Sequence, residues 1–215
     1  MLGFCSNVGP SFLFGIIAPQ FSGMSYAWLL WGIHVFSALA VALLLPRSNT
    51  ETISILPPKN LSLADALKQA IAVMSRVCGW IVIFRVILAF LQRWILWMFP
   101  ESWQVIITGI LELSNGCCSL AAINDLRVRF LVSSGLLAFG GLCVTMQTVS
   151  VTNGLSLRYY FLGKLLQTTF SILLSWLVFP SAPEIAAAAL IFCALLVISL
   201  RKLQNNSSIP MTVGV

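Results

Sequence analysis

An apolar stretch long enough to cross a membrane, Val105–Ile123, carries one acidic residue, Glu112, near its middle. An ionised side chain at that depth costs about 3 kcal/mol or more, so it normally faces a polar cavity, a partner or a substrate path. The Asn115-Gly116 step that follows can break a helix, which a membrane tolerates where protein or water satisfies the backbone. We therefore predict a membrane protein with an internal polar site. Two interpretations of Glu112 stay open: a place on a transport route, or a structural carboxylate paired with Arg85 or a backbone amide.

The composition supports this class of protein. Of the 215 residues, 59% are hydrophobic and 8% are charged, whereas charged residues reach about 25% in soluble domains. Several apolar windows approach the ~20 residues that cross a bilayer, which predicts an all-α, polytopic transmembrane bundle with broken or re-entrant helices. The net charge of +6 comes from residues scattered at helix ends. This is typical of positive-inside topology, and we expect no nucleic-acid partner.

The pattern predicts a membrane-embedded domain over residues 1–203 and a polar tail over 204–215. Pro10 would interrupt a straight helix near the N-terminus, and Ser62 with Asp65 resembles a capping box. The expected elements, in chain order, are a re-entrant hairpin at 4–20, a span at 25–45, an amphipathic surface helix at 62–76, a span at 78–98, a broken span at 103–125, a re-entrant hairpin at 130–155, and spans at 157–179 and 184–200.

The 130–155 segment contains Gly140-Gly141, followed by a group of polar residues that includes Gln147. Adjacent glycines can permit close helix packing, but with the polar residues they favour a break that lines a cavity. If this segment is re-entrant and the Glu112 segment crosses, Arg127, Arg129 and most other basic residues fall on one side, as positive-inside topology requires. Broken elements at 4–20 and 130–155 then enter from opposite faces, which is typical of inverted-repeat transporters.

Candidate site residues lie beside the expected breaks, and unpaired polar groups there would be costly. We expect Asn7, Glu112, Asn115 and Gln147 to converge on one site. Arg85 could snorkel to the interface or pair with Glu112. His34, the single histidine, is either hydrogen-bonded structurally or part of a proton relay. The full set of candidate substrate- or ion-binding residues is Asn7, Gly9, Pro10, Arg85, Glu112, Asn115, Gly116, Gly140, Gly141 and Gln147.

Four motifs together carry a resemblance to one family. They are Gly3–Gly15 (GFCSNVGPSFLFG), Ile33–Ala38 (IHVFSA), Glu112–Gly116 (ELSNG) and Gly140–Gln147 (GGLCVTMQ). In order and spacing they resemble the YlbJ-type sporulation integral membrane proteins of the nucleoside-recognition (Gate) domain family. The resemblance covers nearly all of this chain but only the C-terminal half of the family's usual protein.

The resemblance implies a bacterial membrane protein of spore formers that acts at the forespore membrane in the movement of dipicolinic acid. It also implies a homo-oligomer or a missing N-terminal half, since the first-half motif does not occur in this chain. The nucleoside-recognition label reflects similarity to nucleoside transporters and leaves a nucleoside-type solute open as an alternative.

The resulting hypothesis is transport of a small organic anion by a protein embedded in the lipid bilayer. Amides at broken helix N-termini would contact the carboxylates, Arg85 would be a counter-charge, and Glu112 would act as a proton or cation site or a gate. The alternative is a non-transporting structural or assembly protein. We expect no enzyme, no cofactor and no metal site, because His34 has no partner at a spacing typical of a catalytic or metal-binding motif.

Overall fold

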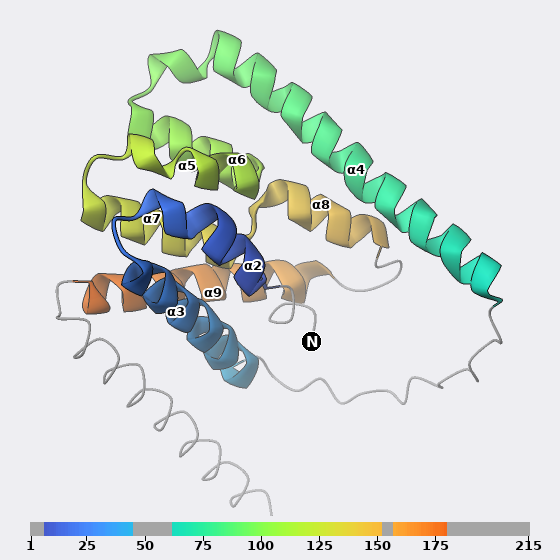
Figure 1. Ribbon diagram of the computed structural model, residues 1–215, viewed down its shortest axis with the longest axis horizontal. Helices are drawn as coiled ribbons and strands as arrows, with labels where there is room; N and C mark the ends of the chain where they lie inside the picture. Colours follow the sequence, from blue (N-terminus) through green and yellow to red (C-terminus); the bar gives the residue numbers. More distant parts are fainter. Residues whose placement is uncertain (1–6, 45–61, 152–156, 180–215) are drawn as a thin grey trace, which may run out of the picture.

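The computed structural model describes residues 7–44, 62–151 and 157–179, and every regular element in these ranges is helical (Figure 1). This confirms the all-α prediction. Four helical stretches are long and apolar enough to cross a membrane: Met24–Ala42, Leu63–Trp94, Leu126–Val151 and Tyr160–Val178. The chain is therefore an integral membrane protein. The expected span at 184–200 and the tail at 204–215 lie outside the described residues.

The N-terminal segment is a short helical path followed by a turn. It consists of α2 (Pro10–Phe12), the π-helical turn η1 (Leu13–Ile17) and the 3-10 turn η2 (Ala18–Gln20), and α3 (Met24–Leu44) follows. Pro10 occupies the start of α2, where its missing N–H is no loss. The predicted hairpin at 4–20 is thus wrong for the part that is described, because the chain turns only at residues 21–23.

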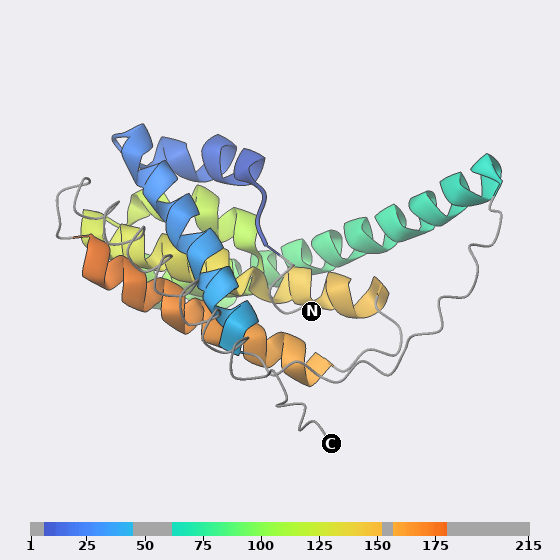
Figure 2. The same cartoon turned by 90° about the horizontal axis from the view of Figure 1, so that it is seen from below.

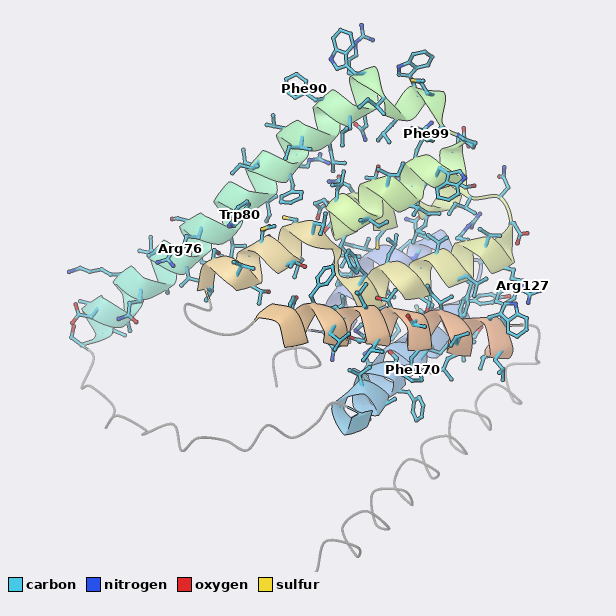
Figure 3. All side chains as sticks on the ribbon, turned by 180° about the vertical axis from the view of Figure 1, so that it is seen from behind. Arg76, Trp80, Phe90, Phe99, Arg127 and Phe170 are labelled. Atoms are coloured by element: carbon cyan, nitrogen blue, oxygen red, sulfur yellow. The ribbon has the colours of Figure 1, made fainter. Side chains whose placement is uncertain are left out.

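The next helix, α4 (Leu63–Trp94), is continuous over 32 residues. The predicted surface helix at 62–76 and span at 78–98 are therefore one element, since nothing between them breaks a helix. Ser62 caps its start by accepting from the Asp65 amide at 3.2 Å, which confirms the predicted cap. In Figure 2 the N-terminal half of α4 projects beyond the other helices. Phe90, 63% exposed, points away from them in Figure 3 and belongs to a surface suited to lipid.

The Glu112 segment folds back on itself. Helix α5 (Glu101–Leu111) ends at Glu112, and α6 (Leu113–Cys118) with the 3-10 turn η4 (Leu120–Ala122) returns along it. The two helices lie so close that a Cβ built on Gly116 would be 2.2 Å from the Gly109 Cα. The predicted break is present, but the predicted crossing over 103–125 is wrong, because paired glycines let α6 pack against α5.

The opposite correction applies to the predicted re-entrant hairpin at 130–155. Helix α7 (Leu126–Phe139) stops at Gly140 and α8 (Gly141–Val151) begins directly after it. Yet α8 continues away from α7 instead of turning back along it (Figure 1). It packs against α4, α5 and α6, while α7 packs against α9 (Leu157–Val178) and α3. The element is a broken span.

One predicted crossing is a hairpin and one predicted hairpin is a crossing, so the number of crossings before α9 stays the same. If the candidate spans cross the membrane, a hairpin at 101–122 and a crossing at 126–151 leave the direction of α9 unchanged but place Arg127 and Arg129 on the face opposite to the predicted one. Arg129 donates to the carbonyl oxygens of Ile123 at 2.9 Å and Gln20 at 2.8 Å, and Arg127 lies over the Trp176 ring at 5.9 Å. Both cations therefore have structural partners near the start of α7.

Helices α3, α7 and α9 enclose the core together with η1. Phe130 and Ile17 are fully buried at its centre. The Ser134 and Ser171 hydroxyls lie 2.6 Å apart where α7 meets α9, and the small side chains let these two helices approach.

Candidate functional site

Glu112 ends one helix and starts the next. Its amide donates to the Thr108 carbonyl at 2.8 Å, and its backbone is extended (φ −140°, ψ 113°). Its carboxylate accepts from the Ser114 amide at 3.0 Å and from the Asn115 amide at 2.7 Å. A helix N-terminus favours a negative cap. Glu112 is only 8% exposed, so the tip of the hairpin holds a buried carboxylate.

Arg85 reaches this carboxylate through Asn115. The Asn115 side-chain nitrogen donates to Glu112 Oε2 at 2.6 Å, and its oxygen accepts from Arg85 Nη1 of α4. Arg85 and Glu112 form no direct ion pair in the structure. Two structural partners were predicted for Glu112. The backbone amide bonds to it directly, whereas Arg85 is linked to it only through the Asn115 side chain. The chain Arg85–Asn115–Glu112 ties the lipid-exposed helix α4 to the hairpin.

The two helix breaks meet at this tip. Gly140 and Gly141 both have a φ of +81°, which fits their predicted role as a break. A Cβ built on Gly141 would lie 3.1 Å from the Leu113 amide nitrogen, directly after Glu112. The start of α8 therefore lies against the start of α6, with Glu112 beside both.

The other sequence-predicted site residues lie elsewhere. Gln147 donates to Cys143 Sγ in its own helix at 3.3 Å, and Asn7 accepts from the Gln167 amide of α9 at 3.0 Å. Gly9 and Pro10 are exposed at the start of α2. The structure thus brings together Arg85, Glu112, Asn115, Gly116, Gly140 and Gly141, but gives Asn7 and Gln147 other partners.

A second polar cluster escaped the sequence reasoning. Lys164 is 2% exposed, and Gln167 is fully buried. Together with Ser171 and Ser175, also fully buried, they form a polar stripe along α9 at helical spacing. The helical spacing of these polar residues inside an apolar span is the sequence pattern that could have predicted the cluster.

His34 of α3 belongs to this second cluster. It is 1% exposed, and neither ring nitrogen has a hydrogen-bond partner among the described residues. Lys164 is close enough to interact with it electrostatically. The predicted structural hydrogen bond of His34 is therefore not present in the part of the chain that is described.

The fold and these clusters define an α-helical integral membrane protein with buried polar groups at two places. No protein-family model, no curated protein and no solved structure matches the chain. Within the described residues no group of three or more His, Cys, Asp or Glu side chains is arranged to hold a metal ion.

Proposed function

We propose that this protein transports a small organic anion across a membrane. The observation that carries the proposal is the meeting of two backbone breaks at one buried carboxylate, where Gly141 lies against Leu113 and beside Glu112. Broken helices that meet inside the membrane are a recurring feature of secondary transporters, because they leave main-chain groups available to a solute.

The start of α8 supplies the chemistry for an anion. The first amides of a helix have no acceptor within that helix, and the helix dipole makes this end positive. Gly141 adds no side chain that would cover these amides. Glu112 lies beside them, held by α6. We assign it the role of a gate or a proton or cation site, since a carboxylate repels an anionic solute.

The resemblance to the YlbJ-type family makes dipicolinic acid, moved during sporulation at the forespore membrane, the first solute to test. The family's usual protein is about twice as long as this chain. The proposal therefore also includes a functional unit that is larger than one copy of the chain. We therefore propose a homo-oligomer that forms on reconstitution.

The test is uptake of radiolabelled dipicolinate into proteoliposomes that contain the purified chain. We expect uptake by the wild type and loss of most of it in Glu112→Gln. Gly79→Ala, in exposed α4 with open space around the glycine, is the matched control and should transport normally. Uptake of uridine in place of dipicolinate would favour the nucleoside-type alternative.

A structural role is the second candidate, and one observation favours it. Both Glu112 carboxylate oxygens are already hydrogen-bonded inside the hairpin, which is what a purely structural cap requires. A wild-type protein that inserts and folds but carries no solute in this assay would support the structural role and rule out transport.

A further inference from the structure

A groove of about 590 Å³ lies between α8 and α9, and its walls are almost wholly apolar. Thr145 lies in the α8 wall, but its hydroxyl donates to the Gly141 carbonyl of the same helix at 3.1 Å. The groove is open to the surroundings of the bundle, because four of its side chains are between 38% and 47% exposed: Met146, Phe161, Leu162 and Leu165. In an integral membrane protein these surroundings are lipid, so the groove suits a hydrocarbon chain.

An arginine lies at the end of α8 to which this groove leads. Leu142, Met146 and Ser150 are four residues apart, so they follow one face of α8, and the first two line the groove. Arg76 of α4 donates from Nη1 to the Ser150 carbonyl at 3.2 Å, beside the end of α8 (Figure 3). A guanidinium carries five N–H donors, and Arg76 is exposed. It can therefore bind an anionic acceptor as well as this carbonyl.

The two helices that meet at Arg76 place it at the level of lipid headgroups. On α4, Arg76 directly precedes the apolar stretch Val77–Leu91, in which Arg85 is the only charged residue. On α8, Ser150 is one residue from the end of the candidate span Leu126–Val151. Both helices thus reach the edge of the apolar layer at this point, where basic side chains meet phosphate groups.

We infer that this protein binds an anionic phospholipid, with one acyl chain in the groove and the headgroup phosphate at Arg76. The apolar walls match the hydrocarbon chain, which brings no polar group that would need a partner. The guanidinium matches the phosphate, which it can bind through two parallel hydrogen bonds. Leu142 follows Gly141 directly, so the acyl chain extends from the membrane surface to the glycine break.

The test of the headgroup contact is native mass spectrometry of the delipidated full chain, titrated with dioleoyl-phosphatidylglycerol and with dioleoyl-phosphatidylcholine. The acyl chains are identical, so the difference in affinity reports the net charge of the headgroup. We expect phosphatidylglycerol to bind about fivefold more tightly, which corresponds to about 1 kcal/mol. Arg76→Gln should abolish this preference and leave the affinity for phosphatidylcholine unchanged. Arg93→Gln removes an exposed arginine at the other end of α4 and should keep the preference.

The test of the acyl-chain contact fills the groove from either wall. Met146→Trp places an indole there from α8, and it should weaken binding of both lipids about tenfold or more, because each buried methylene of a lipid chain contributes to binding. Leu165→Trp fills the groove from α9 and tests the contact independently if Met146→Trp does not fold. Met24→Trp changes an exposed methionine of α3, outside the groove, and should bind both lipids as the wild type does.

Three outcomes would overturn the inference. One is equal affinity of the wild type for the two lipids, and another is a preference for phosphatidylglycerol that Arg76→Gln retains. The third is wild-type lipid binding by both groove variants; if their oligomeric mass changes at the same time, a second copy of the chain occupies the groove instead. Lipid binding is measured without flux, so the result stands or falls separately from the proposed transport.

Discussion

Glu112 and Gly140 each interrupt a helix, yet the chain turns back at the first and continues past the second. At Glu112 the backbone is extended and the carboxylate caps the returning helix. At Gly140 the backbone is left-handed, and the following helix packs against other elements. The difference shows that a helix break alone does not decide whether the chain turns back or continues. The course of the chain depends on what the next helix can pack against. At the first break, the Gly109–Gly116 contact lets α6 pack back against α5.

The largest effect is expected from Gly116→Ala. The new methyl would lie 2.2 Å from the Gly109 Cα and 2.5 Å from its nitrogen, and backbone cannot move aside as a side chain can. Overpacking of this kind costs about 3 kcal/mol or more. Thermal denaturation in detergent should show a large loss of stability. Gly79→Ala is the control, with a change of at most about 1 kcal/mol in the stabilising direction; similar midpoints for both variants would contradict the close hairpin.

Glu112→Ala should have the next largest effect, about 2 kcal/mol, because it removes the cap of α6 and leaves the Ser114 and Asn115 amides without their acceptor. Glu112→Gln keeps one side-chain oxygen that can accept from these amides, so it should lose less stability than Glu112→Ala. The measurement is again the denaturation midpoint of each variant. A greater loss for Glu112→Gln than for Glu112→Ala would show that the cap is not what holds the hairpin.

The glycine break allows a comparison of two neighbours with the same φ. Gly140→Ala should cost about 1 kcal/mol, the penalty of a left-handed backbone for an L residue in open space. Gly141→Ala should cost more, since its methyl also approaches the Leu113 amide at 3.1 Å. Gly140→Asn should cost less than Gly140→Ala, because Asn tolerates this conformation. Equal stability of all three with the wild type would argue for a straight helix through Gly140.

The positions of both breaks could be predicted from sequence, because each depends on local chemistry: a carboxylate with the Asn-Gly step, and a pair of glycines. Their directions could not, because the return of α6 depends on Gly109 and Gly116 meeting, and the position of Arg129 depends on carbonyls such as that of Gln20, 109 residues away. The cap at Ser62 was predicted for the same local reason. The buried cluster of α9 could not be predicted either, because Gln167 meets Asn7 across 160 residues of sequence.

The smallest perturbation tests the direction of the hairpin itself. In a cysteine-free background, single cysteines at Asn124, Glu101 and Lys68 replace exposed side chains, so stability should change little. If the chain turns back at Glu112, Asn124→Cys should react with an impermeant maleimide from the same side as Glu101→Cys, and Lys68→Cys from the other side. A crossing at 103–125 would pair Asn124→Cys with Lys68→Cys instead. Because Glu101 and Lys68 lie at the same ends of their helices in either arrangement, only the Asn124 result changes, and it alone decides which of the two breaks reverses the chain.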